Sequence, residues 1–313
     1  MTADLAWLRR TGCTLSAALL FVASGSSPAD AFCRTTTCDS SKESCGPPAG
    51  SVCTIQGMPI AWPSLCVSYS LQKDGSPRIP FDTFKVVTER SFGTWTAADC
   101  GGGKGPTITL QEGATVTCDQ PEYNQHAGNA NIVMVRNDDW PYPNGSHTLA
   151  LTTVTFNTQN AQIYDVDMEV NGVQVNVTAS DDMIDYDLQS ILTHEAGHFL
   201  GLAHSDDPTA TMYASYQRGT IGLRSLEADD VEGICAVYGQ ERAVGGTCDA
   251  TPRHGFKESC GDVPASGEGA GAGGGCAMRE QGRGAGMGGW IASLAAVLVS
   301  AGAAGARRRR RDP

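Results

Sequence analysis

Residues 194–204 read HEAGHFLGLAH, and the interpretation of the whole chain starts from this stretch. On an α-helix His194 and His198 lie one turn apart on the same face. Their neutral imidazoles can therefore bind one Zn²⁺ together. Glu195 is rotated by about 100° around the helix, so it can lie beside the metal and accept a proton from a water there.

A turn after this helix supplies a third ligand. Gly201 tolerates positive φ, so the helix can end there and the chain can bring His204 back toward the metal. Three protein ligands leave the fourth position of a tetrahedral zinc open, as in catalytic sites. Ordinary surface histidines would explain a lone pair of histidines, but not five specified positions in eleven residues. Because such a zinc lowers the pKa of water to about 7, we predict peptide-bond hydrolysis with Glu195 as general base.

The pattern His-Glu-x-x-His-x-x-Gly-x-x-His resembles the metzincin signature, and further residues resemble its matrixin branch, the matrix-metalloprotease-like family. Ser205 follows the third histidine, and Met212 stands in a segment similar to the Met-turn that supports the zinc. Residues 226–239 are similar to the closing helix, and 92–95 to the end of the first helix. The likeness extends over about residues 60–240. It implies an α+β, metzincin-like fold with a twisted, mostly parallel sheet of about five strands and three main helices.

The chain departs from the family pattern at two places. Ala214 stands where a proline usually follows Met-Tyr, so Tyr213 and Tyr216 are the candidates for the wall of the S1′ pocket. No full inhibitory pro-segment fits between Phe32 and the first strand. Cys45 lies in a faint likeness to the family's cysteine switch, where a thiolate would cap the zinc, but the even cysteine count favours a disulfide.

Two strands carry further candidate sites. Leu149, Ala150 and Leu151 resemble the upper edge strand of the cleft, where the backbone could pair with an extended substrate; the alternative is an interior strand. Asp165, Asp167 and Glu169 alternate and so share one face of a strand. Ca²⁺ takes such oxygen ligands, and the resemblance implies calcium nearby. We favour a solvated face, because the glycine-rich metal loop of the family and its extra histidines are missing.

The N-terminus is typical of a secretory signal. Arg9 and Arg10 precede the mostly apolar stretch 15–23, and small residues precede Phe32. This pattern predicts a signal peptide over 1–31. The alternative is an N-terminal anchor helix, for which the apolar run is too short.

The C-terminus is predicted to be a sorting tail over 276–313. Cys276 is followed by the uncharged stretch 287–306, which is long enough to cross a membrane as a helix, and then by an arginine cluster. This order resembles a bacterial tail of the MYXO-CTERM type. The resemblance implies recognition at Cys276, removal of the helix and display at the cell surface. A plain tail anchor is the alternative.

The part between these signals is acidic and rich in cysteine. The signal is neutral and the tail carries seven arginines against one Glu and one Asp, so the net charge of −12 for the whole chain becomes −17 for residues 32–275. This charge argues against nucleic-acid binding. Ten cysteines remain, which predicts five disulfides and an oxidising compartment. Cys100 with Cys118 is the local pair that we favour.

Hydrophobic periodicity predicts strands and then interleaved helices. Asp185 or Asp187 is expected to cap the zinc helix, and Ser225 the last helix. The expected strands are 66–71, 132–135, 148–156 and 163–170, and the expected helices are 81–95, 188–200 and 226–238. The predicted domains are the signal 1–31, a Cys-rich lead-in 32–65, the protease domain 66–240, a Cys-containing Gly-rich linker 241–275 and the tail 276–313.

We therefore predict a secreted or surface-displayed zinc endopeptidase of a bacterial envelope. It would act as a monomer on protein or peptide substrates, with one catalytic Zn²⁺, and would touch the membrane only through the C-terminal helix until that helix is removed. The alternative is a catalytically weak, disulfide-rich surface binding module on a metzincin scaffold. The intact Glu195 and three histidines argue against it.

Overall fold

The computed structural model describes residues 32–38, 45–143, 145, 148–242 and 247–261, together with the backbone of 290–298. Five of its strands form a mostly parallel sheet in the order β5-β6-β4-β2-β3, in which β5 alone is antiparallel to its neighbour. The bounds are β2 (Cys66–Leu71), β3 (Thr109–Glu112), β4 (Ile132–Arg136), β5 (Thr148–Asn157) and β6 (Ile163–Asn171).

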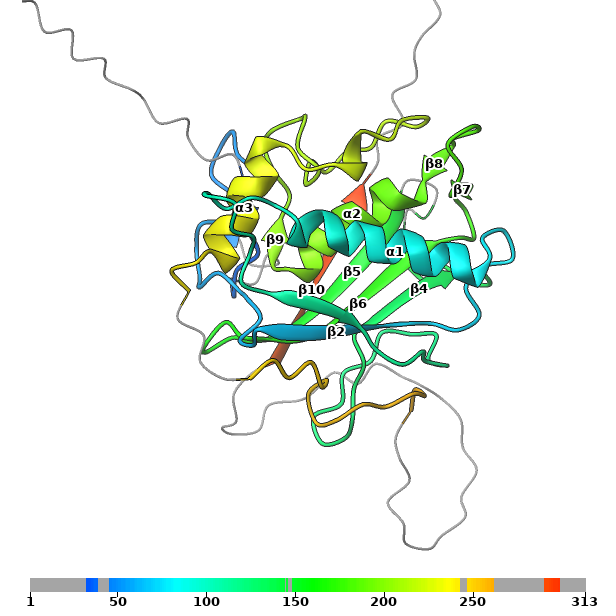
Figure 1. Cartoon of the computed structure of the whole chain (residues 1–313), viewed down its shortest axis with the longest axis horizontal. Coiled ribbons are helices and arrows are strands. Elements are labelled where there is room, and N and C mark those ends of the chain that lie inside the picture. Colours follow the sequence, from blue (N-terminus) through cyan, green and yellow to red (C-terminus); the bar gives the residue numbers. More distant parts are fainter. Residues whose placement is uncertain are drawn as a thin grey trace, which may run out of the picture.

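Helices α1 (Phe81–Thr96) and α2 (Leu188–Phe199) cross one face of this sheet, and α3 (Ala228–Tyr238) lies at the side (Figure 1). The core lies between α1, α2 and the strands. Trp95 is fully buried there, and its indole Nε1 donates to the carbonyl of Thr193 on α2 at 2.7 Å. Three helices over a mostly parallel sheet confirm the predicted α+β, metzincin-like class.

Most predicted elements match the structure to within two residues, and the exceptions have local causes. Asp187, one of the two expected caps, begins α2 and accepts a hydrogen bond from the backbone of Ser190. The last helix is capped by Glu227 instead of Ser225, because Glu227 and Asp230 satisfy each other's backbone amides as a capping box. Strand β3 was not predicted. It has four residues, and with a single aliphatic side chain it shows no alternation.

Four short strands complete the described core of the molecule. They are β1 (Cys33–Arg34), which pairs with β9 (Leu202–Ala203), and β7 (Val177–Thr178), which pairs with β8 (Tyr186–Asp187). A single-turn helix, η2 (Gly222–Arg224), precedes α3.

The C-terminal stretch differs from the prediction. Instead of a membrane-crossing helix over 287–306, the structure has strand β10 (Trp290–Leu298), antiparallel to β5 on the side away from β6. A strand can form here because the outer side of β5 offers free backbone donors and acceptors. The rest of 287–306 lies outside the described residues. Within the described part of the chain, no helix has the length and apolar character needed to span a bilayer.

The ten cysteines of 32–275 form five disulfides, as predicted. The favoured pair Cys100–Cys118 is wrong. Cys100 bonds to Cys235 on α3, and Cys118 bonds to Cys260, because the fold brings these distant segments within bonding distance, with Cα–Cα separations of 5.3 and 4.8 Å. Cys45 is bonded to Cys38 and is therefore not a free thiolate for the zinc. The remaining bonds are Cys33–Cys53 and Cys66–Cys248.

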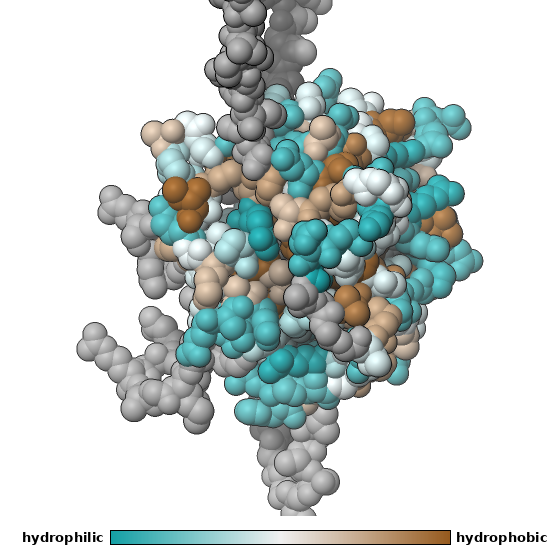
Figure 2. Space-filling view, turned by 60° about the vertical axis from the view of Figure 1, so that its left-hand side comes forward, coloured by the Kyte–Doolittle hydropathy of each residue, from teal (hydrophilic) through white to brown (hydrophobic). Residues whose placement is uncertain are grey.

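Residues 247–261 pack against the loop that precedes β4, although they stand in the predicted linker. Thr117 donates its amide to the carbonyl of Glu258, and Lys257 donates its amide to Asn129. In Figure 1 this gold segment lies beside the loop that precedes β4. Hydrophilic residues predominate on the face shown in Figure 2, where apolar residues form only small, separate patches.

The long-range disulfides should contribute more to stability than the local one. Replacing Cys100 and Cys235 by serine opens a connection across 135 residues. Because Cys66–Cys248 and Cys118–Cys260 remain and shorten the loop that this bond closes, loop entropy predicts a loss of about 4 kcal/mol in the free energy of unfolding. The matched control removes Cys38 and Cys45, which are 7 residues apart, at a cost of about 2 kcal/mol. Denaturant unfolding under oxidising conditions measures both. Equal losses would contradict the entropic account.

Candidate active site

The candidate site residues on helix α2 are buried. Leu188, Leu192 and Phe199 are fully buried in the core. They hold one side of the helix against the sheet and α1. His194 and His198 lie on the same helix, are 2% and 1% exposed, and face a common point.

The three histidines of the sequence motif converge. The candidate ligand nitrogens of His194, His198 and His204 lie within 4.8 Å of one another, and Nε2 of His198 is 3.2 Å from Nε2 of His204. Two imidazole nitrogens on one tetrahedral zinc, each at ~2.0–2.1 Å, would lie ~3.3 Å apart. The spacing in the structure therefore suits a single ion.

The opposite ring nitrogens have backbone partners. Nδ1 of His194 lies 2.7 Å from the carbonyl oxygen of Thr211, and Nδ1 of His198 lies 2.9 Å from that of Leu202. A carbonyl only accepts, so each Nδ1 carries the proton and each Nε2 keeps its lone pair for a metal. The carbonyls also fix the orientation of both rings.

The turn that returns His204 depends on Gly201 and on the lead-in. Gly201 has φ +89°, and a Cβ there would lie 2.8 Å from the carbonyl oxygen of Ile60. Strand β1 pairs with β9 inside this turn, and the amide of Thr35 donates to the carbonyl of Gly201 at 3.0 Å. The disulfide-bonded lead-in thus supports the segment between the second and third histidines.

Met212, in the segment that resembles a Met-turn, lies against helix α2. A Cβ on Gly197 of α2 would come within 2.1 Å of its sulfur, so the glycine makes room for the methionine. Asp230 of α3 holds the turn, because its two carboxylate oxygens accept the amides of Thr211 and Met212 at 2.7 and 2.9 Å. Asp230 lies in the predicted closing helix, but its sequence position indicated no role of this kind.

Glu195 is fully buried next to His194, and Thr152 of β5 donates its hydroxyl to Oε2. Burial raises the pKa of Glu195 to about 8, while the hydrogen bond from Thr152 acts in the opposite direction. The other oxygen, Oε1, is buried and has no hydrogen-bond partner in the structure. Thr152 was not among the predicted site residues, because a threonine in a strand rich in β-branched residues carries no signal of its own.

The donor set fits a zinc ion. Nε2 of His194 is buried and has no hydrogen-bond partner, which is costly unless a further group binds there. Burial and the neighbouring His204 lower the pKa of His194 to about 3, and burial lowers that of His204 to about 4. The rings are therefore neutral near pH 7, as metal binding requires. Three neutral imidazoles beside one carboxylate match the ligands that zinc prefers in catalytic sites.

An apolar pocket opens next to His194 and Glu195. The two tyrosines predicted for the S1′ wall, Tyr213 and Tyr216, both line it. Its space is about 240 Å³ including the mouth. The other lining residues are Leu149, Ile191 and Leu223.

The predicted edge strand has a neighbour on each side in this structure. Ala150 and Leu151 of β5 pair with Val170 and Glu169 of β6, and Ala296 of β10 pairs with Leu151 from the other side. The backbone that an extended peptide would need is thus the backbone that β10 uses. Leu149 reaches the apolar pocket from this strand.

The three acidic residues of β6 are buried, at 2%, 1% and 0% exposure for Asp165, Asp167 and Glu169, so their face is not solvated as we had favoured. Glu169 pairs with Arg136 at 2.6 Å, and Asp167 accepts the amide of Ile132. Burial and Asp167 raise the pKa of Asp165 well above its usual value. Their carboxylates do not form a three-ligand group like that of the histidines, so a calcium site is not shown.

Comparison with known proteins shows which family the region around this site resembles. The family model described as Matrixin matches residues 124–239, which include β4 to α3 and with them the three histidines, Glu195 and Met212. In fold and in site residues, this part of the chain is similar to the matrixin class of metalloproteinases.

Individual relatives agree with this class. The chain is 31% identical to Metalloendoproteinase 1 of Glycine max over 164 residues, which are 52% of this chain and 48% of that protein. It is 24% identical to Matrix metalloproteinase-C of Caenorhabditis elegans over 209 residues, 60% and 32% of the two chains. It is 50% identical to Neutrophil collagenase of Homo sapiens over 54 residues, 17% and 12%. The chain spans less than half the length of each of these relatives.

The contact between Thr152 and Glu195 yields a testable prediction. Thr152→Val keeps the shape of the side chain but removes a hydrogen bond to a carboxylate, a loss of about 1.5–3 kcal/mol. We expect kcat/KM for peptide cleavage to fall at least about tenfold, with zinc content unchanged in elemental analysis. Thr153→Val is the matched control, since that hydroxyl has no partner in the structure. A similar loss in both variants would argue against a specific role for Thr152.

Proposed function

We propose that this protein is an exported endopeptidase that hydrolyses peptide bonds in protein or peptide substrates. His194, His198 and His204 would hold one Zn²⁺ through their Nε2 atoms. When bound, the ion lowers the pKa of water to about 7 and polarises a carbonyl oxygen. Met212 supports the ligands from below.

Glu195 is the general base of this proposal. Its free Oε1 is the atom that would accept the proton of the attacking water and pass it to the leaving amine nitrogen. Thr152 holds Oε2 and so fixes the direction in which Oε1 points. Surrounding burial excludes bulk water from the carboxylate.

The proposal rests mainly on two buried atoms that have no hydrogen-bond partner in the structure. Nε2 of His194 and Oε1 of Glu195 come from neighbouring residues, and neither has a hydrogen-bond partner in the structure. A buried polar atom without a partner costs about 1–3 kcal/mol. Binding of a metal and a water next to it would satisfy both atoms at once.

Substrate binding would use β5 and the adjacent pocket. An extended peptide would pair with Leu149, Ala150 and Leu151 by strand addition. The side chain after the scissile bond would enter the pocket walled by Tyr213 and Tyr216. The substrate would take the place along β5 that β10 has in this structure.

Export and surface display complete the proposal. Five disulfides fit an oxidising compartment outside the cytosol. The signal 1–31 would direct secretion, and the tail 276–313 would be recognised at Cys276 and processed at the surface of a bacterial envelope. Both segments are proposed from sequence pattern, and the mature enzyme would act as a monomer.

Glu195→Ala tests the proposed mechanism. We expect zinc to stay at one ion per chain, because the three ligands are intact, while peptide cleavage falls by about 10²–10⁴-fold through loss of the proton transfer. Glu89→Ala, an exposed residue of α1, is the control and should behave like the unaltered protein. Full activity of Glu195→Ala would remove Glu195 as the base. A zinc-loaded parent protein that cleaves nothing in a broad peptide library would favour the binding module instead.

Removal of the C-terminal tail tests the use of β5. Because β10 pairs with the strand that substrate would need, a chain that ends at residue 275 should cleave peptides faster than the full chain. Rates at equal zinc content measure the difference, and a peptide with the sequence 290–298 added in excess should slow the shortened chain. Equal rates for both chains would show that the outer side of β5 is not where substrate binds.

A further inference from the structure

The pocket next to Glu195 is small. Its space is about 240 Å³ including the mouth, below the roughly 300–1,000 Å³ that ligand pockets usually have. Leu223 of η2 and Ile191 of α2 both line it. If this pocket receives the residue after the scissile bond, as proposed above, the position of Leu223 limits the size of that residue.

The loop that carries Leu223 is joined to the segment before α2 by hydrogen bonds of the backbone and of the Tyr216 hydroxyl. The amide of Asp187 donates to the hydroxyl of Tyr216 at 3.1 Å, and that hydroxyl donates to the carbonyl of Thr220. The amide of Gly219 donates to the carbonyl of Asp185 at 2.8 Å. Tyr216 therefore stays in the pocket wall, and the loop has little freedom to move away from the helix.

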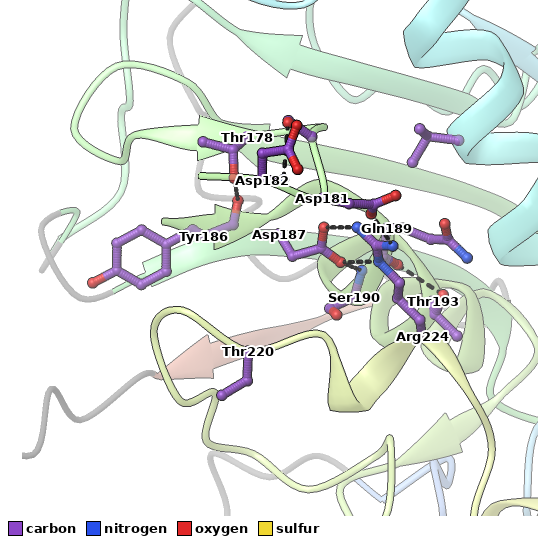
Figure 3. Close-up of polar contacts among 12 residues, drawn as sticks. Thr178, Asp181, Asp182, Tyr186, Asp187, Gln189, Ser190, Thr193, Thr220 and Arg224 are labelled. Carbon is purple, nitrogen blue, oxygen red and sulfur yellow. Dashed lines mark hydrogen bonds and ion pairs between the residues drawn. The ribbon is translucent and has the colours of Figure 1, made fainter. Parts of the chain in front are cut away.

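Arg224, the residue directly after Leu223, forms ion pairs with two carboxylates. In Figure 3 its guanidinium reaches the carboxylates of Asp187 and Asp181. Nε and Nη2 contact the two oxygens of Asp187 at 2.8 and 2.6 Å, and Nη1 contacts Asp181 at 2.6 Å. The side chain of Asp187 is fully buried, whereas that of Asp181 is 80% exposed. The bidentate contact with Asp187 gives both strength and direction, and the exposed contact adds little.

Asp187 connects Arg224 to helix α2. The same carboxylate oxygen that accepts Nε of Arg224 also accepts the amide of Ser190 and so caps α2. Leu223 is thereby fixed relative to the helix that carries His194 and Glu195. Because the carboxylate of Asp187 both caps α2 and binds Arg224, the folded chain itself fixes the depth of the pocket.

We propose that Arg224 is a specificity-determining positioning residue, whose ion pair with Asp187 holds Leu223 in the pocket so that it accepts a small aliphatic side chain. The substrates are then polypeptides with alanine or valine after the scissile bond. Those with leucine, methionine or phenylalanine there are poor substrates, because the larger side chain would have to displace Leu223. This inference rests on the proposed function.

The test compares four peptides that differ only in the residue after the scissile bond, namely Ala, Val, Leu or Phe. For the unaltered zinc-loaded protein, kcat/KM should favour Ala and Val over Phe by about tenfold or more. Leu223→Ala, which leaves the ion pair intact, should shift the Phe-to-Ala ratio upward by about tenfold. Arg224→Gln should shift it in the same direction, and Arg224→Lys by less, since lysine keeps the charge but not the fork.

The control and a second readout separate specificity from general damage. Asp182→Asn changes an exposed neighbour that has no contact with Arg224 in Figure 3, and its ratios should equal those of the parent. Peptide hydroxamates with a methyl or a benzyl group at this position should show the same order in calorimetric binding. Should the Arg224 variants fail to fold because a buried Asp187 is left unpaired, Leu223→Ala still decides.

Three results would overturn the inference. One is a parent protein that cleaves best before Leu or Phe. Another is a Leu223→Ala variant whose four rates change by one common factor, as a merely structural residue would give. The third is a folded parent that binds zinc and cleaves none of the four peptides or a broad library, which would overturn the proposed function and this inference with it.

Discussion

The hydrogen bonds from Nδ1 of His194 and His198 to the carbonyls of Thr211 and Leu202 determine which nitrogen of each ring is free. Without them each imidazole could rotate or exchange tautomers, and the lone pairs would not meet. With them, both Nε2 atoms point to one place before any ion arrives. The accepting carbonyls belong to the Met-turn and to β9, so the zinc helix alone does not define the site.

Those two backbone segments are in turn held by distant parts of the chain. Strand β1 of the lead-in pairs with β9, and Asp230 of α3 accepts the amides of Thr211 and Met212. The hydroxyl of Tyr238 connects the end of α3 to the carbonyl of Leu200. Lead-in, Met-turn and closing helix therefore act together on the geometry of three imidazoles, although none of them supplies a ligand.

The sequence predicts the parts of this arrangement whose signal is local. The spacing of His194, His198 and His204 reports directly on a helix and a turn, and so helix, fold class and candidate ligands were predictable. Contacts between distant segments were not. Thr152 becomes important only because β5 lies against α2, and Cys100 pairs with Cys235 only because the loop after α1 meets α3.

Burial was the other property that the pattern did not reveal. Asp165, Asp167 and Glu169 alternate as a solvated face would, yet both faces of β6 are covered. A backbone amide and Arg136, from segments far away in sequence, bind the carboxylates of Asp167 and Glu169. The uncharged C-terminal stretch has the length of a membrane helix, but a strand forms where β5 offers an unpaired side. In each case, the segment that determines the local structure lies far away in the sequence.

The three long-range disulfides have a consequence if the protein cuts peptide bonds as proposed. Cys66–Cys248, Cys100–Cys235 and Cys118–Cys260 all join the first half of the domain to the second. A cut in the exposed loop around Met183, which is 83% exposed, would leave two pieces that are still covalently joined. Such a nicked molecule would keep its shape and run as two fragments on a gel only after reduction. Cleavage of the protein by other copies of itself would thus accumulate without releasing either fragment.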